Sequence, residues 1–124
     1  MYAVWPERTR LFAFDAVADS YRLAAEAVHG VLFPVGSAWQ AVWRVDPQFA
    51  LYGPDGFHPS VAATYLAALV FYRVLYGELP ESFAVPAVAD ELAGTPMHLS
   101  DRDLQLLVSA ANEVVAARPG CCEP

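Results

Sequence analysis

The sequence contains no lysine, and its seven basic residues are all arginine. They stand against 14 acidic residues, which gives a formal net charge of −7 at pH 7. Proteins that bind nucleic acid usually present an excess of basic residues, because attraction to the phosphate backbone supplies much of the binding energy. The acidic balance of this chain therefore argues against a nucleic-acid partner.

Cysteine is also scarce, since the only two cysteines are the adjacent pair Cys121 and Cys122. A disulfide between neighbouring residues is strained, and the C-x-x-C spacing of redox and zinc sites is absent. Glycine-rich cofactor loops such as G-x-G-x-x-G do not occur either. Histidines 29, 58 and 98 are far apart and have no metal-ligand spacing. We therefore predict no cofactor and no metal site.

Long apolar runs are absent as well. The apolar run at residues 61–72 ends at Arg73 and is shorter than the about 20 residues that a bilayer-spanning helix needs. Residues 1–8 lack the basic start, apolar stretch and cleavage site of a signal peptide. As it stands, the chain is expected to have no membrane span and to be cytoplasmic. A targeting signal of any longer parent protein would lie upstream.

Apolar residues make up 56% of the chain, which predicts a folded core. Two short apolar segments, residues 2–5 and 31–35, are predicted to be strands. A helix is expected between them, so they should pair in parallel. In all, the 3.6-residue periodicity and the capping residues predict four helices, at residues 15–29, 37–44, 61–76 and 101–117.

The helix at residues 61–76 has the clearest boundaries. Pro59 suits a first helical turn, Ser60 can bond a free backbone amide, and Gly77 can end the helix. The apolar positions of this helix are spaced to pack against a sheet, and they are Leu66, Leu69, Val70, Val74 and Leu75.

The motif Asp55-Gly56-Phe57-His58-Pro59 stands directly before this helix. A carboxylate three residues before an imidazole, on a turn closed by proline, can present an orienting acid and a general base from one loop. We expect a carboxylate oxygen of Asp55 within hydrogen-bond reach of Nδ1 of His58. A structural role is the alternative, in which Asp55 caps the turn and His58 is a polar helix cap. From these residues alone, the two interpretations stand about equal.

Residues 55–77 resemble the last conserved block of the SGNH (GDSL-type) serine esterases and lipases. The likeness is carried by Asp55-Gly-Phe-His-Pro-Ser60 and by the apolar helix at residues 65–72, and it extends more weakly over residues 1–100. In that family, the Asp and His of this turn complete a Ser-His-Asp triad. The resemblance therefore implies that Asp55 and His58 are catalytic, with Asp55 orienting the base His58.

The resemblance also implies an α/β fold class, namely part of a flavodoxin-like three-layer α/β/α hydrolase with few parallel strands and four helices. A complete domain of that kind needs about 200 residues, whereas this chain has 124. The family's Gly-Asp-Ser and Gly-x-Asn-Asp turns do not occur here. We expect residues 1–120 to form one domain, the carboxyl-terminal part of such a hydrolase, followed by a tail at residues 121–124.

No serine of the chain fits the nucleophile position. Ser20 and Ser109 fall inside helix patterns, and the others are expected to be helix caps or a loop residue, namely Ser37, Ser60, Ser100 and Ser82. The chain is therefore expected to carry the Asp-His half of an ester hydrolase and to be inactive alone. Joined to a nucleophile-bearing segment, it would act on a small acyl ester or an acylated carbohydrate.

A second class of function stays open. A non-catalytic remnant would use an uncovered sheet edge and its apolar faces to associate with itself as a homo-oligomer. Trp39 and Trp43 lie four residues apart on one helix face, and we expect them in the core rather than beside a substrate cleft. A Gly-Asp-Ser turn encoded in frame before Met1 would favour the hydrolase.

Overall fold

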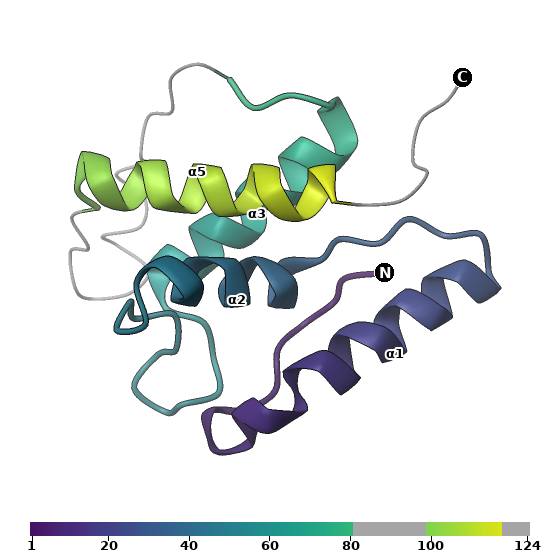
Figure 1. The fold of residues 1–124 in the computed structure, drawn as a ribbon, viewed down its shortest axis with the longest axis horizontal. Coiled ribbons are helices and arrows are strands. Elements are labelled where there is room, and N and C mark those ends of the chain that lie inside the picture. The colour runs from purple at the N-terminus through teal and green to yellow at the C-terminus, as the bar shows by residue number, and fades with distance from the viewer. Residues whose placement is uncertain (81–98, 118–124) are drawn as a thin grey trace.

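The computed structural model describes residues 1–80 and 99–117, and this part of the chain is helical (Figure 1). The four helices expected from the sequence periodicity are confirmed, with ends that differ from the prediction by at most two residues. A short 3-10 helix, η1, precedes them and was not predicted. In chain order, the elements are η1 (Arg8–Ala13), α1 (Phe14–Ala27), α2 (Val35–Val45), α3 (Val61–Tyr76) and α5 (Asp101–Ala116).

The predicted α/β fold class is wrong, because residues 1–80 and 99–117 form helices and contain no strand. The two segments predicted as strands, residues 2–5 and 31–35, do meet in parallel. Their pairing is limited to a single bridge between Tyr2 and Phe33. The partial three-layer arrangement with a central parallel sheet is therefore absent from the described part of the chain.

Proline and the start of α2 end this pairing after one bridge. Pro34 has no N–H to donate, and Val35 already begins the helix. The N–H of Gly36 donates to the carbonyl of Ala3 at 3.0 Å. Gly36 already belongs to α2, so this bond does not extend the strand pairing. A Cβ at position 36 would lie 2.5 Å from a backbone oxygen of the first segment, so this close approach requires glycine. Two such short segments are in any case too few for a stable sheet.

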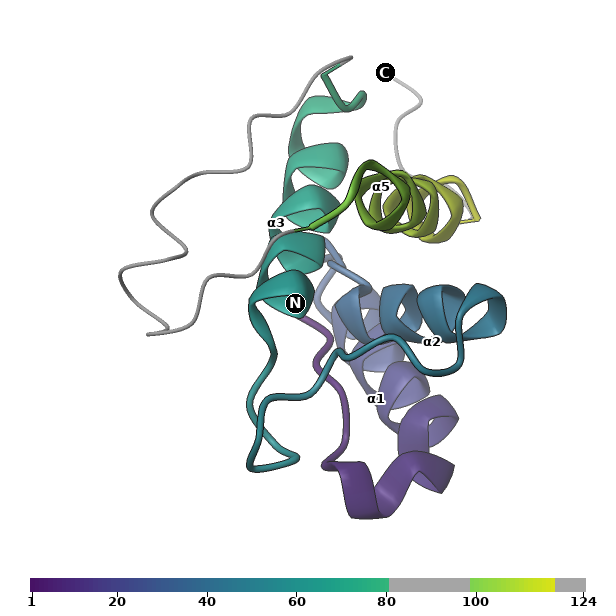
Figure 2. The ribbon, with the colours of Figure 1, turned by 90° about the vertical axis from the view of Figure 1, so that its left-hand side faces the viewer.

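The core of the described chain lies where α2, α3 and α5 meet. Helix α5 lies along α2 in Figure 1, and α3 runs across both in Figure 2. The predicted burial of Leu66, Leu69 and Val70 is confirmed, but these side chains pack against helices rather than a sheet. Leu75, expected on the same face, is 61% exposed, because it lies in the last turn of α3. The largest fully buried side chains are Trp39, Leu51, Leu66, Leu107, Val35, Val42 and Val70.

Aromatic rings attach the amino-terminal segment to this core. Trp5 stacks on Trp39, with ring centroids 4.1 Å apart. Tyr2 packs edge-on against Phe71 of α3, with ring centroids 5.2 Å apart. Trp39 is fully buried, which confirms its expected place in the core, whereas Trp43 is only partly buried. The segment before η1 is therefore held by ring packing where a sheet was expected to hold it.

The ends of the last two described helices follow the predicted capping. Gly77 ends α3 with a φ of +85°. Residues other than glycine rarely adopt this backbone conformation. Ser100 and Asp103 form the capping box at the start of α5, with bonds of 3.2 and 3.0 Å. No helix in the described ranges is long and apolar enough to cross a membrane.

Candidate functional site

Asp55 and His58 lie on the turn that leads into α3, and their side chains meet. Nδ1 of His58 lies 2.5 Å from Oδ2 of Asp55. The other carboxylate oxygen, Oδ1, accepts hydrogen bonds from the backbone N–H groups of Phe57 at 3.0 Å and of His58 at 2.9 Å. The predicted geometry of the pair is confirmed, and the catalytic role of the two residues stays a prediction.

These hydrogen bonds keep the Asp55 carboxylate ionised. They lower its pKa to about 2, first through the bond with the His58 side chain and then through the two backbone N–H groups. An ionised carboxylate can only accept, so Nδ1 of His58 carries the proton and Nε2 is the nitrogen that can act as a base. The His58 side chain is 73% exposed, and no described residue hydrogen-bonds Nε2. The pair therefore presents an oriented base to the solvent.

The turn is anchored to the amino-terminal segment by two long-range hydrogen bonds. The N–H of Arg8 donates to the carbonyl of Gly56 at 2.8 Å, and Nε1 of Trp5 donates to the carbonyl of Phe57 at 3.1 Å. Gly56 has a φ of +68°, as the tight turn requires. Sequence reasoning identified Gly56 but missed Arg8 and Trp5, since their partners lie about 50 positions further along the chain.

A local pairing closes the turn at its base. Tyr52 and Pro59 form an antiparallel bridge, and the N–H of Gly53 donates to the carbonyl of His58 at 2.7 Å. This bridge holds Pro59 outside the helix, so its expected place in the first helical turn is wrong. Ser60 is the N-cap and Val61 the first helical residue. The backbone of His58 is therefore held at its N–H by Asp55 and at its carbonyl by Gly53.

The hydroxyl groups of the described serines are mostly engaged elsewhere. Ser60 accepts from the N–H of Ala63 at 3.1 Å and donates to the carbonyl of Ala50 at 2.7 Å, which confirms it as a cap. Ser20 donates to a carbonyl of its own helix. Ser37 lies inside α2 rather than capping it, because the helix begins two residues earlier. Ser82 lies outside the described residues.

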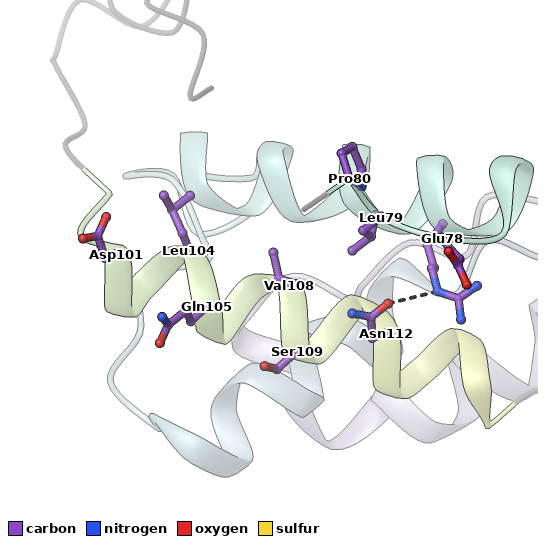
Figure 3. A pocket seen from close by; sticks show the side chains of 10 residues that line it. Glu78, Leu79, Pro80, Asp101, Leu104, Gln105, Val108, Ser109 and Asn112 are labelled. Atoms are coloured by element: carbon purple, nitrogen blue, oxygen red, sulfur yellow. Dashed lines mark hydrogen bonds between the residues drawn. The ribbon is translucent and has the colours of Figure 1, made fainter. Parts of the chain in front are cut away.

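A hollow of about 830 Å³ lies between the end of α3 and α5 (Figure 3). Arg73 and Asn112 both line it, and Nε of Arg73 donates to Oδ1 of Asn112 at 2.9 Å. Neither Asp55 nor His58 lines this hollow. Pro80 and Asp101 stand at its rim, and residues 81–98 between them lie outside the described chain. The hollow therefore carries no assignment.

A second hollow, of about 510 Å³, lies between η1 and the segment that leads into the Asp55–His58 turn. Arg8 contributes to its wall and also contacts the turn through the bond to Gly56. We call it the Arg8 hollow, and its lining residues are Arg8, Leu11, Trp43, Pro47, Gln48, Phe49, Ala50, Leu51 and Tyr52. No group of three His, Cys, Asp or Glu side chains within residues 1–80 and 99–117 is placed to hold a metal ion.

The pKa of Asp55 predicts a pH dependence. Its folded value of about 2 lies below the ordinary 3.8, so ionised Asp55 stabilises the fold above about pH 4. That contribution is lost as the pH falls from about 4 towards 2. We expect the ¹³C signal of the Asp55 carboxylate to titrate near pH 2 and to move up towards 3.8 in His58→Ala. If the Asp55 midpoint is the same in His58→Ala and wild type, the hydrogen bond between Asp55 and His58 is contradicted. His29→Ala is the matched control and should leave the midpoint unchanged.

Comparison with models of known protein families, with curated protein sequences and with solved structures finds no significant match for this chain. What the site can do is therefore inferred from its own geometry.

Proposed function

We propose that Asp55 and His58 are the acid and base of a Ser-His-Asp triad in an ester hydrolase, completed by a serine from a nucleophile-bearing segment joined to this chain. One observation carries the proposal. The Asp55 carboxylate holds Nδ1 of His58 at 2.5 Å, while the imidazole ring remains exposed at the surface. This is the arrangement that a general base needs before its substrate arrives.

The chemistry follows from the two ring nitrogens. Asp55 keeps the proton on Nδ1 and stabilises the imidazolium cation that forms during the reaction. Nε2 of His58 takes the proton of the serine hydroxyl while the serine oxygen attacks the ester carbonyl. The same proton then passes to the departing alcohol, and a water molecule releases the acid by the same route. The resemblance of residues 55–77 to the SGNH esterases favours small acyl esters or acylated carbohydrates as substrates.

The helical fold removes one line of support for that resemblance, because the expected sheet is absent from the described chain. The support that remains is local. It consists of the Asp55–His58 contact, the turn closed at Pro59, and the buried helix that begins directly after Ser60. In a triad these features determine the position of the base. The nucleophile can come from different secondary-structure elements, because triads occur on unrelated folds.

The proposal is tested by adding the nucleophile. The purified 124-residue chain is expected to hydrolyse short-chain aryl esters no faster than its His58→Ala variant, because general-base assistance needs a positioned nucleophile. The coding sequence upstream of Met1 is read for an in-frame Gly-Asp-Ser turn, and the extended protein is then expressed. It should turn over the same esters and bind a fluorophosphonate probe, which labels activated serines.

Two outcomes would count against the proposal. An extended protein with a Gly-Asp-Ser turn but no ester turnover would remove the catalytic role of the pair. Robust turnover by the 124-residue chain itself, lost on His58→Ala, would place the nucleophile among the chain's own serines.

A self-associating module is the second candidate, and the surface of η1 and α1 favours it. Phe12 is 87% exposed, and four further apolar side chains of this region are exposed as well, namely Leu11, Leu23, Val28 and Val31. Exposed apolar groups of this kind are typical of interaction surfaces. Concentration-dependent sedimentation, together with the absence of any nucleophile turn upstream of Met1, would favour this candidate over the hydrolase.

A further inference from the structure

The Arg8 hollow combines an apolar lining with one cation. Its volume of about 510 Å³ is in the range of small-molecule sites, which are lined by apolar and aromatic side chains and a few polar groups. Leu11, Trp43 and Phe49 supply much of the apolar wall, and Arg8 is the only charged side chain among the described residues that line it. An adjoining hollow of about 280 Å³ shares Leu11 and Trp43 and extends the apolar surface towards α1 and α2.

Hydrogen bonds hold the walls of the Arg8 hollow in place. Nε1 of Trp43 donates to the carbonyl of Phe49 at 2.9 Å, and the N–H of Phe49 donates to the carbonyl of Asp46 at 3.1 Å. On the other side, the hydroxyl of Tyr52 donates to the carbonyl of Pro6 at 2.5 Å. A ligand would therefore enter a preformed site and would not have to order its walls, which otherwise weakens binding.

The guanidinium of Arg8 has no anionic partner among the described residues. The carboxylates of its chain neighbour Glu7 and of the turn residue Asp55 are engaged elsewhere. Glu7 accepts from the hydroxyl of Thr9 at 2.6 Å and pairs with Arg10 at 3.5 Å. Asp55 is engaged by His58 and by two backbone N–H groups. In a chain with a net charge of −7, a cation left unpaired beside an apolar hollow is suited to an anion from outside.

Arg8 also connects the hollow to the catalytic candidate. A Cβ at Gly56 would lie 3.5 Å from Nε of Arg8, so the side chain lies against the Asp55–His58 turn. Burial raises the pKa of Tyr52 to about 12, and the charge of Arg8 opposes that rise. Arg8 and Tyr52 thus line the same hollow, and the Arg8 side chain also lies against the turn.

We propose that the Arg8 hollow binds a small carboxylate with an aryl or short acyl body, the body packing against Trp43 and Phe49 and the carboxylate pairing with Arg8. Ester hydrolysis releases such an acid, so the hollow would hold the acyl part of the substrate in the proposed function. Only this last assignment rests on the proposed function. Binding itself is a property of the 124-residue chain and is tested without turnover.

The probe is 4-phenylbutanoate, and its neutral counterpart is 4-phenylbutan-1-ol. The indole N–H signal of Trp43, assigned with Trp43→Phe, is followed by NMR during titration of the 124-residue chain. We expect a saturable shift with a Kd on the order of 1 mM for the acid, the affinity typical of a ligand of this size. The alcohol should bind about 3- to 10-fold more weakly, because it lacks the charge-assisted hydrogen bonds to Arg8.

Arg8→Gln should remove this difference between acid and alcohol, whereas the control Arg22→Gln should keep it. Arg22 carries the same charge but lies on the exposed face of α1, paired with Asp19 and Glu26. The proposal is overturned if Trp43 shows no saturable shift, or if acid and alcohol bind the wild-type chain equally. The second result needs no variant, so a misfolded Arg8→Gln cannot hide it.

The two proposals fail separately. If acid binding depends on Arg8 but the extended protein has no esterase activity, the proposed hydrolase function is rejected. The proposed carboxylate site is then retained. If the extended protein is an esterase but 4-phenylbutanoate does not shift the Trp43 indole N–H signal, only the proposed carboxylate site is rejected.

Discussion

Replacing His58 by alanine in the protein extended with its nucleophile segment is expected to lower kcat/KM for a short aryl ester by about 10²- to 10⁴-fold, the usual contribution of a general base. Asp55→Asn should cost up to about 10⁴-fold, because an amide at that position favours the wrong tautomer of the imidazole. Both follow from the contact between Asp55 Oδ2 and His58 Nδ1. Initial rates with p-nitrophenyl acetate from pH 5 to 9 measure them.

The control for these variants is His29→Ala. His29 is an exposed histidine at the end of α1, far along the chain from the Asp55–His58 turn. Its replacement should leave kcat/KM unchanged. Equal activity of wild type and His58→Ala would end the general-base assignment, and a loss shared by His29→Ala would point to a general effect on folding.

Replacing Leu66 by alanine is expected to lower the free energy of unfolding by about 2–5 kcal/mol, since Leu66 is fully buried and its truncation leaves a cavity. A loss of that size is a large part of the about 5–15 kcal/mol by which a typical domain is stable. Leu66 lies in α3, in the core that this helix shares with α2 and α5. Urea unfolding followed by circular dichroism measures the loss.

Leu75→Ala is the matched control, because it makes the same change in the same helix at a position that is 61% exposed. Its effect should stay within about 0.5 kcal/mol, as for most surface substitutions. Similar losses for the two variants would contradict the helical core, since a sheet packed on α3 was expected to bury both residues.

The helices were predictable because their signals are local. The start of α3 depends on Ser60 bonding an amide three residues on, and its end depends on the positive φ of Gly77. The box of Ser100 and Asp103 marks the start of α5 in the same way. The contact between Asp55 and His58 was predictable for the same reason, since it spans three residues of one turn.

The predicted strands failed because pairing depends on more than apolar composition. Residues 2–5 and 31–35 do approach each other in parallel, as expected, but they form only one bridge. The missing N–H of Pro34 and the immediate start of α2 leave no room for a second one. The apolar face of α3 was taken as the partner of a sheet, although periodicity alone cannot distinguish a sheet from packed helices.

The sequence by itself determined where the helices lie, how they are capped, and that the Asp55 and His58 side chains meet before α3. Each of these features depends on residues within one or two turns of one another. Only the tertiary structure decided that α3 packs against helices and that Trp5 and Arg8 anchor the turn. It also decided that Arg8 lies beside an apolar hollow, with no anionic partner among residues 1–80 and 99–117. The two anchoring bonds join residues about 50 positions apart, and the helix packing also joins segments that are distant in the chain. Contacts over such distances leave no periodic or local signal in a single sequence.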